Sequence, residues 1–498
     1  MSRSPSSRRA LARAAVLLLL VAAVAYPVWR LVRSPGRFNL LVVLVDTLRA
    51  DHLACYGYSR DTSPTIDGLA AEGILFEECL APAPWTIAST ATLLTGLEPF
   101  AHGFVRPEFA PLAPAAVTIA EVLRDRGYRT AGFSGNMLIS ELSGFDQGFS
   151  PLHTDVWGKA PTLNAGAIPW LRENGPRGRF FLYMHYFDPH DPYDDPEGLW
   201  RSYAGLAPGA PAGEERCRNG DIEEAFQSMR DGEDPGLTAA DKARLVDRYD
   251  GEIRFVDGEI GKLLAEVRAL GLEDETVVVF TSDHGEQFFE HGGMKHGSSL
   301  FREELHVPLV FRVPGGRKGE RRPERVGLVD VFPTVLGLLG IDAPGPVDGR
   351  DVLGSPPDPE RLAFSETSHG WATLDGLQKE GQELLSVRGP GGKTAILGPE
   401  TAADYPRFFD DPAESKNLAG PPPPAWADDL VRKIRDWRAR TAERVLPNRP
   451  LSPEQQKEMR GQLEKLGYIG KPRAANPKPK PAPPEKADEA GEAGEKRE

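Results

Sequence analysis

Two short stretches of the chain combine side chains that could bind a metal ion. Asp283 and His284 follow an apolar run and precede Gly285, whose freedom allows a tight turn that presents a carboxylate and an imidazole to one cation. Asp46 ends another apolar run, where a buried carboxylate is costly unless it is paired or metal-bound. Arg49 could pair with Asp46, and a turn that caps a helix is the alternative at Asp283.

A third stretch places a hydroxyl at the expected start of a helix. Thr86 precedes a helical run to Leu94, and Gly96 is a typical C-terminal stop. Helix N-termini bind anions, so the Thr86 hydroxyl would lie where a phosphoryl or sulfuryl group is held. The alternative is that Thr86 is only the N-cap of that helix.

Strand-like and helical patterns alternate around these candidates. Apolar runs predict strands at 39–45, 128–134, 180–187, 276–280 and 307–312. Helical spacing predicts helices at 64–72, 86–94, 115–126 and 239–270. The alternation predicts an α/β fold with a mostly parallel central sheet flanked by helices, in which functional residues collect beyond the carboxyl ends of strands. Four candidates are expected there: Asp46, Asp188, Asp283 and His284.

The chain is long enough for several structural units. Its 498 residues are 40% hydrophobic, which allows a large core. We expect a catalytic domain over 38–355 with an insertion or lid at 194–238, and a small C-terminal α+β subdomain with helices over 356–472. Residues 473–498 have the composition of a disordered tail. The cysteines Cys55, Cys79 and Cys217 allow either one bridge with one free thiol or three free thiols.

Charge and the N-terminus bear on partners and location. The net charge of −14 argues against a nucleic-acid partner, but a bound metal could still attract an anionic substrate. Within residues 1–37, an apolar or small run at 14–29 lies between arginines. A membrane anchor and a cleaved signal peptide both fit this run, and a buried helix is the third alternative. The basic residues at 30–37 favour the anchor, so we expect an extracytoplasmic catalytic domain, or an exported or periplasmic one after cleavage.

Longer motifs occur in an order that resembles the sulfatase family of the alkaline phosphatase superfamily. They extend from about residue 39 to 470 and include VDTLRADHLACYGYSRDTSPTIDG, TLLTGLEPFAHG, FFLYMHYFDPHDPY, FTSDHGEQFFEHGG and HVPLVFR. The resemblance implies an ester hydrolase or transferase in which Asp46, Asp283 and His284 bind a divalent cation. It also implies that Arg49 braces the site and that position 86 is the nucleophile.

The nucleophile position departs from the sulfatase pattern. Sulfatases carry a Cys or Ser there, converted to formylglycine within a Cys/Ser-x-Pro-x-Arg signature, whereas this chain has TIAST from Thr86 to Thr90. Oxidation of threonine would give a ketone rather than an aldehyde, so the formylglycine mechanism is not expected. Phosphodiesterase and phosphoglycerol-transferase relatives use Thr as the nucleophile, which implies a covalent phosphothreonine intermediate. The expected reaction therefore involves phosphate-type esters.

The expected metal set also departs from that of sulfatases. Thr47 stands where sulfatases often have a second Asp. The remaining mixed oxygen and nitrogen shell favours Mn²⁺ or Zn²⁺, with Ca²⁺ or Mg²⁺ as alternatives. The expected ligands are Asp46, Thr86, Asp283 and His284.

The departing alkoxide needs a proton or a cation. The candidates are His190, His296 and Lys295, and the two histidines match positions of the family that face the ester. A second metal bound by Asp188, His190 and His296 is the alternative to a single-metal site. His102 and Asn136 match positions near the cleft, His185 is either functional or structural, and we interpret His291 and His306 as structural.

We thus predict a metal-dependent hydrolase or phosphoryl transferase acting on an anionic ester, which could be lipid- or glycan-linked. A sulfatase that attacks sulfate esters directly with Thr86 is one alternative. A binding protein that kept the fold but lost catalysis is the other.

Overall fold

The computed structural model describes residues 38–104, 110–155, 158–207, 219–230, 233–367, 383–399, 405–447 and 450–465. The expected membrane segment at 14–29, the expected tail at 473–498 and Cys217 lie outside these ranges. Within them, no helix has both the length and the apolar character needed to cross a membrane. Cys55 and Cys79 are free thiols, and Cys79 is buried.

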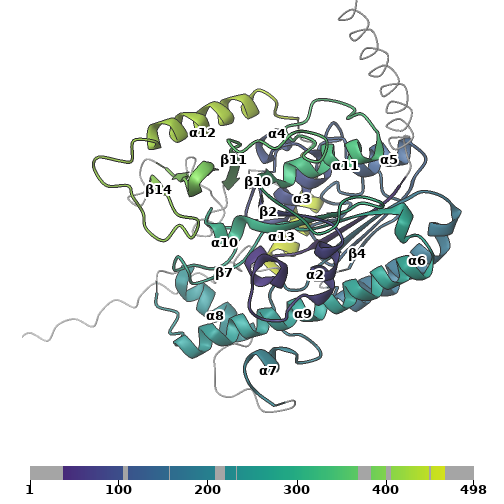
Figure 1. The fold of residues 1–498 in the computed structure, drawn as a ribbon. Helices are drawn as coiled ribbons and strands as arrows, with labels where there is room; N and C mark the ends of the chain where they lie inside the picture. Colours follow the sequence, from purple (N-terminus) through teal and green to yellow (C-terminus); the bar gives the residue numbers. More distant parts are fainter. Residues whose placement is uncertain are drawn as a thin grey trace, which may run out of the picture.

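A central eight-stranded sheet confirms the predicted α/β fold (Figure 1). At its centre β1 (Asn39–Val45) pairs in parallel with β5 (Phe180–Tyr186) and β6 (Thr276–Ser282). All three strands are buried along their whole length, which explains their continuous apolar runs. The sheet continues on one side with β3 (Arg129–Ser134) and β4 (Leu152–Thr154), and on the other with β9 (His306–Arg312), β2 (Ile74–Leu80) and β10 (Glu320–Gly327).

The register of the central strands positions the site. Val45 of β1 lies beside Tyr186 of β5 and Ser282 of β6. The three strands therefore end at the same level, and the residues that follow them emerge at one edge of the sheet. This alignment brings Asp46 and Asp283, which are distant in sequence, to the same place.

The outer part of the sheet differs from expectation. Among the described strands of this sheet, β9 alone runs against the direction of the others. Neither β2 nor β10 was predicted from the sequence. β2 interrupts its apolar residues with two glutamates, and the polar sequence ERRPERVG of β10 lies at the edge of the sheet.

Helices cover both faces of the sheet (Figure 1). One face carries α2 (Pro64–Ala71), α6 (Ala160–Asn174) and the long α9 (Ala239–Ala269), and the other carries α3 (Thr86–Thr95), α5 (Ile119–Asp125) and α11 (Val331–Leu339). Shorter segments near the site are α4 (Pro99–His102), β7 (Gln287–Phe288), β8 (Met294–Lys295) and α10 (Arg302–Leu305). The expected insertion contains α7 (Trp200–Tyr203) and α8 (Asn219–Arg230).

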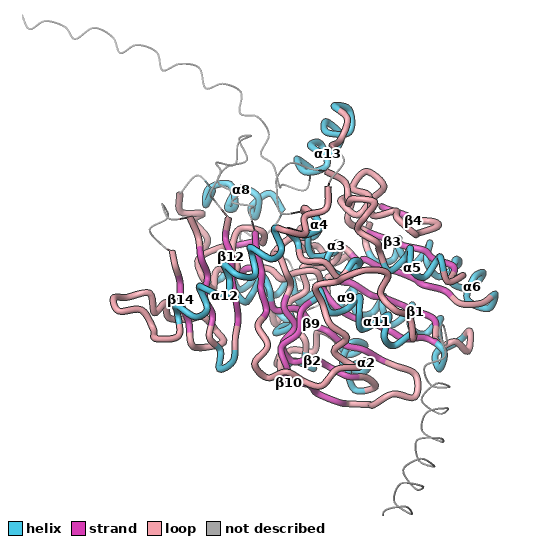
Figure 2. The backbone as a smooth tube through the Cα atoms, turned by 90° about the horizontal axis from the view of Figure 1, so that it is seen from above, coloured by secondary structure: helices cyan, strands magenta, loops and turns pink. Residues whose placement is uncertain are grey.

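A smaller antiparallel sheet lies at one end of the molecule (Figure 2). It consists of β11 (Ala363–Thr367), β12 (Leu384–Arg388), β13 (Thr394–Leu397) and β14 (Arg407–Phe409), and it packs with α12 (Ala427–Ala442) around its own apolar cluster. The described chain ends in α13 (Pro453–Lys465). An ion pair of 3.0 Å between Arg438 of α12 and the buried Glu366 of β11 joins the helix to the sheet.

Candidate active site

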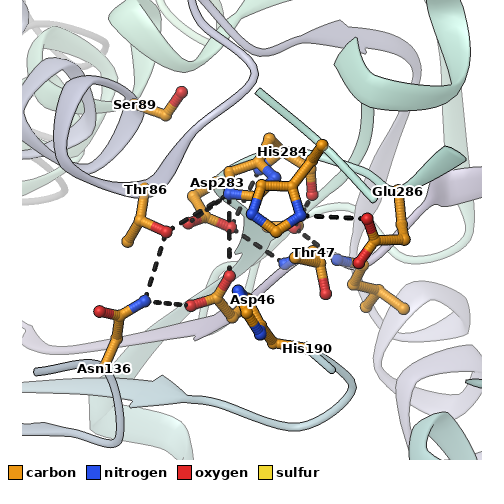
Figure 3. A network of polar contacts seen from close by, with 12 residues as sticks. Asp46, Thr47, Thr86, Ser89, Asn136, His190, Asp283, His284 and Glu286 are labelled. Atoms are coloured by element: carbon orange, nitrogen blue, oxygen red, sulfur yellow. Dashed lines mark hydrogen bonds and ion pairs between the residues drawn. The ribbon is translucent and has the colours of Figure 1, made fainter. Parts of the chain in front are cut away.

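Two carboxylates and one imidazole converge beyond the ends of β1 and β6 (Figure 3). Asp46 follows β1, and Asp283 and His284 follow β6; all three side chains are fully buried. Each offers one ligand atom, and these atoms lie within 4.8 Å of one another. Among the described residues, this is the group of histidine and acidic side chains with the spacing of a metal site.

The unsatisfied atoms of this group fit a divalent cation. Oδ1 of Asp46 and Oδ2 of Asp283 are buried and have no hydrogen-bond partner among the described residues. Nε2 of His284 lies 3.4 Å from Oδ2 of Asp283 and 3.8 Å from Oδ1 of Asp46. Nδ1 of His284 donates to the Gly285 carbonyl at 3.0 Å, which leaves Nε2 as the coordinating nitrogen. Two buried carboxylates with unpartnered oxygens are stable together when a cation neutralises them.

The other carboxylate oxygens are held in place. Oδ2 of Asp46 accepts hydrogen bonds from Nδ2 of Asn136 at 2.7 Å and from Nε2 of His185 at 3.2 Å. Oδ1 of Asp283 accepts from the backbone N–H groups of Thr47 at 3.2 Å and His284 at 3.0 Å. One oxygen of each carboxylate is therefore fixed by the protein while the other faces the metal position.

The pKa values of the two carboxyl groups are shifted in opposite directions. Burial acts to raise the pKa of Asp46, but the hydrogen bond from His185 and the nearby His190 lower that pKa below its ordinary value. Burial and the negative charge of Asp46 raise the pKa of Asp283. A second positive charge would favour the ionised form of both groups.

Thr86 is the first residue of α3, and its hydroxyl does not cap the helix. The N-cap position belongs to Trp85, and no side-chain capping bond is present, so the interpretation of Thr86 as an N-cap is wrong. Its Oγ1 instead lies 3.4 Å from Nε2 of His284 and accepts a hydrogen bond from Nδ2 of Asn136 at 3.3 Å. Ser89, one turn further on, donates to a backbone carbonyl at 2.6 Å and is engaged elsewhere. The helix ends at Gly96 as predicted, with a positive φ of 68°.

A strained turn connects β1 to Arg49. Thr47 has a φ of 54°, which is unusual for a β-branched residue and is found at functional sites. The hydroxyl of Tyr249, from α9, donates to the Thr47 carbonyl at 2.7 Å and accepts from the backbone N–H of Arg49 at 2.9 Å. The long helix therefore holds the turn that carries Asp46.

Arg49 does not pair with Asp46, which excludes the salt bridge considered from the sequence. Its guanidinium binds Asp51 at 2.8 Å and also pairs with Glu290. Nη1 donates to the backbone carbonyl of Glu286 at 3.0 Å. Arg49 thus joins the loop after β1 to the loop after β6.

Three buried histidine rings, one of them the ring of His284, lie next to one another at the metal group. The ring centroids of His284 and His296 are 4.4 Å apart, and those of His296 and His190 are 4.9 Å apart. Nε2 of His190 is buried without a hydrogen-bond partner among the described residues. The His296 ring is therefore in contact with both the His190 ring and the ring of the proposed metal ligand His284.

Glu286 belongs to the same cluster, although no role was predicted for this residue. Its carboxylate is fully buried and lies 3.0 Å from Nδ1 of His296. Burial and the negative charge of Asp191 raise the pKa of Glu286 to about 8. The only indication in the sequence was that Glu286 lies two residues after His284. This position does not predict a contact with His296, ten residues further along the chain.

Lys295 lies beside this cluster, and its positive charge is already paired with carboxylates. Its ammonium group pairs with Asp191 at 3.1 Å and with Glu223 of α8 at 3.0 Å. It also lies 4.7 Å from the centroid of the Phe226 ring of the same helix. The described part of the insertion therefore contacts the site through Lys295.

The structure does not assemble the second metal site. Oδ2 of Asp188 accepts from the backbone N–H of Ala160 at the start of α6, at 2.8 Å, and Oδ1 pairs with Lys159 at 2.8 Å. A carboxylate is favoured at this helix terminus. Asp188 is thus turned away from His190 and His296, and the three do not form a metal-binding group.

The remaining histidines support the surroundings. Nδ1 of His185 accepts from Tyr183 at 3.2 Å, so His185 can direct its Nε2–H toward Asp46. His102 contacts Thr92 of α3 at 3.0 Å and is fully buried. His291 and His306 contact backbone carbonyls at 3.0 and 2.9 Å, as expected of structural residues.

Comparisons with known proteins agree with this arrangement. A family model described as Sulfatase matches residues 38–341. The chain is 26% identical to an arylsulfatase of Clostridium perfringens, over 62% of this chain and 76% of that protein. It is 25% identical to the multifunctional alkaline phosphatase superfamily protein PehA of Trinickia caryophylli, over 84% of this chain and 98% of that protein.

A solved structure shares the fold. The phosphonate monoester hydrolase of Agrobacterium radiobacter superposes with a TM-score of 0.62 at 21% identity, covering 81% of this chain and 96% of that one. The family match spans β1, the Thr86 helix and the loop after β6, which together carry the metal group and the hydroxyl described above. The chain therefore belongs to the sulfatase family of the alkaline phosphatase superfamily and is an ester hydrolase.

Proposed function

We propose that this protein cleaves or transfers phosphate-type esters through a covalent intermediate on Thr86. The observation that best supports this proposal is the position of the Thr86 hydroxyl. This hydroxyl does not cap the helix, and its oxygen lies 3.4 Å from Nε2 of His284. Threonine cannot form the aldehyde on which sulfatases depend, so the reaction needs direct attack by its oxygen. That oxygen accepts a hydrogen bond from Asn136, which stabilises negative charge as the hydroxyl loses its proton.

Asp46, Asp283 and His284 would hold the metal, with the Thr86 oxygen as a further ligand. A divalent ion bound there supplies charge neutralisation and favours the ionised hydroxyl. Two carboxylates, one imidazole and one hydroxyl form the mixed donor set that suits Mn²⁺ or Zn²⁺. Elemental analysis of purified protein tests this assignment, and a Ca²⁺- or Mg²⁺-loaded protein would contradict it.

The charges around the site favour esters with a single negative charge. Lys295 is paired with Asp191 and Glu223, and Arg49 is paired with Asp51 and Glu290. These nearby cations are thus already neutralised by carboxylates. A phosphodiester or a phosphonate monoester, each with one negative charge, would match a single divalent ion better than a phosphate monoester dianion.

The experiment compares aryl phosphodiester, phosphonate monoester, phosphate monoester and sulfate ester as substrates, with and without chelator. We expect turnover of the first two to dominate and to vanish without metal. Thr86→Ala should lose roughly 10³-fold or more in kcat, whereas Thr86→Ser, which keeps the hydroxyl, should retain most of it. Mass spectrometry of quenched reactions should detect phosphate on the peptide that contains Thr86.

Two outcomes would reject the proposal. Unchanged turnover by Thr86→Ala would exclude the nucleophile. Dominant cleavage of the sulfate ester would instead support a sulfatase that uses threonine directly, and no turnover of any ester would support a binding protein.

We further propose that residues 1–37 contain an uncleaved membrane anchor and that the catalytic domain lies outside the cytoplasm. The supporting feature is the apolar run at 14–29 with arginines on both sides. A lipid- or glycan-linked ester would be accessible there. Fractionation of cells that express the full chain, followed by protease treatment of intact cells or spheroplasts, tests the location.

A further inference from the structure

Glu223 is a carboxylate that the inserted helix α8 brings to the active site. The helix packs against the body of the molecule through Ile222, Ala225 and Phe226, which lie on one helical face and are at most 5% exposed. Glu223 follows Ile222 directly, and its side chain pairs with the ammonium group of Lys295 at 3.0 Å. Buried apolar residues of the insertion therefore hold a negative charge beside a lysine of the catalytic domain.

Lys295 has a fixed and largely buried position. Its side chain is 5% exposed, and Nζ also pairs with Asp191 at 3.1 Å and lies 4.7 Å from the centroid of the Phe226 ring. A buried ammonium group depends on such partners, because water does not solvate it. The backbone of Lys295 has a φ of 63°, a costly conformation for a residue other than glycine and one that is found at functional sites.

Lys295 and Asp191 adjoin the histidines at the metal group. His296 follows Lys295 directly, and its ring centroid lies 4.4 Å from that of the proposed ligand His284. His190 precedes Asp191 directly, and its ring centroid lies 4.9 Å from that of His296. The charges of Lys295 and its two carboxylate partners therefore act on an ester that is bound at the metal group.

This group of three side chains has a net negative charge to which Glu223 is essential. Two carboxylates and one ammonium group give a net charge of −1, and without Glu223 the carboxylate of Asp191 alone would balance Lys295. A phosphodiester or a phosphonate monoester carries one negative charge, whereas a phosphate monoester carries two above its second pKa of about 6. The additional charge of the monoester is therefore repelled by the group as long as Glu223 is present.

We propose that Glu223 is a specificity-determining residue that disfavours dianionic phosphate monoesters relative to esters with a single negative charge. The inference rests on the proposed function, and it assigns the charge preference of the site to a side chain of the insertion. Glu223 lies on α8, outside the loops after β1 and β6 that carry the metal group. The charge at this position can therefore change while the metal ligands stay the same, and a related chain with a neutral residue there should accept monoesters more readily.

The test compares Glu223→Gln with the wild-type protein on two esters of the same phenol, a phosphodiester and a phosphate monoester. Glutamine keeps the size of the side chain and an acceptor for Lys295, but it removes the charge. At about pH 8, where the monoester is a dianion, we expect the ratio of kcat/KM for the monoester to that for the diester to rise roughly three- to tenfold at low ionic strength. Because Glu223 is 57% exposed, the rise should shrink to less than about twofold in about 0.5 M salt.

Two further variants separate the charge of Glu223 from its structural contacts. Glu223→Asp keeps the charge on a shorter side chain, and its ratio should stay within about twofold of the wild-type ratio. Glu266→Gln is the matched control, because it removes one carboxylate from a surface ion pair with Arg172 in the last turn of α9. This turn precedes β6 and lies at the edge of the sheet opposite the metal group, so the ratio of Glu266→Gln should equal that of the wild-type protein.

Each contrary result rejects the inference. An unchanged ratio in Glu223→Gln, whether or not both activities fall, would show that the charge of Glu223 does not set the preference. A rise that persists in high salt would indicate a change in structure, and an equal rise in Glu266→Gln would indicate an effect of net charge alone. These failures would leave phosphodiester turnover by the wild-type protein intact. Failure of the proposed function would appear separately, as wild-type protein without such turnover or as a fully active Thr86→Ala variant.

Discussion

Replacing Asn136 with alanine would remove two hydrogen bonds at once. The amide Nδ2 donates to Oδ2 of Asp46 at 2.7 Å and to Oγ1 of Thr86 at 3.3 Å. The orientation of the amide is fixed because its Oδ1 accepts from the backbone N–H of Leu138 at 3.0 Å. Asn136 is thus the side chain that connects the carboxylate of the metal group to the nucleophile.

The expected size of the effect follows from these two bonds. A hydrogen bond to a charged group contributes about 1.5–3 kcal/mol, and a longer neutral bond contributes about 0.5–1 kcal/mol. The bond to Thr86 should strengthen as its oxygen becomes negative, so both contributions affect the transition state. A total of about 2–4 kcal/mol corresponds to a roughly 30- to 800-fold fall in kcat for Asn136→Ala.

The assay is steady-state turnover of an aryl phosphodiester, with metal content measured on the same preparation. Asn164 provides a matched control, since it is also buried and donates to Glu259 at 2.8 Å, away from Thr86. Asn164→Ala should lower stability but change kcat by less than about threefold. Turnover of Asn136→Ala within twofold of wild type, at full metal occupancy, would refute this reasoning.

Three further predictions concern metal binding and stability. Asp283→Ala should lose the metal and roughly 10³-fold or more of activity, and full metal content by elemental analysis would contradict the ligand assignment. Burial lowers the pKa of His102 and of His306 to about 3, so folding stability should be intact above the unfolded pKa of 6.5 and fall as pH drops towards 3. The loss between pH 7 and 5 should be about 2 kcal/mol for each histidine by urea unfolding, and a double His→Asn variant with an equal loss would exclude this cause. Gly285→Ala should destabilise the protein by roughly 2 kcal/mol or more, since its Cβ would lie 2.1 Å from the backbone carbonyl oxygen of Glu303. Gly258→Ala is the control, because a Cβ at this position of α9 would lie in open space and should not destabilise the protein. Equal melting temperatures of the two variants would contradict the predicted clash at Gly285.

The central part of the fold could be predicted because its strands carry a simple pattern. β1, β5 and β6 are buried throughout, and burial on both faces requires continuous apolar sequence. The direction of β9 could not be predicted, since a buried strand has the same composition whichever way it runs. α6 was also missed because Pro169 lies within it. Without α6, the sequence offered no reason for Asp188 to turn toward a helix N-terminus.

The site was predictable to the extent that strand ends define it. Asp46 and Asp283 follow neighbouring strands, so their proximity followed from the fold class. Asn136 and Glu286 contact residues from other segments, and neither polarity nor spacing along the chain indicates such contacts. Thr86 was predictable in part. The start of its helix was predicted, but the direction of its hydroxyl depends on contacts with Asn136 and His284.

The long helix α9 contacts two separate segments of the chain, through residues at a fixed spacing along the helix. Tyr249 holds the turn after β1, and eight residues later Asp257 accepts from the backbone N–H of Ile66 at the start of α2. Inserting one residue between them would rotate one contact relative to the other by about 100° and shift it by about 1.5 Å. Related proteins that keep both contacts can therefore vary in length within their surface loops, but the spacing of these two residues should be invariant.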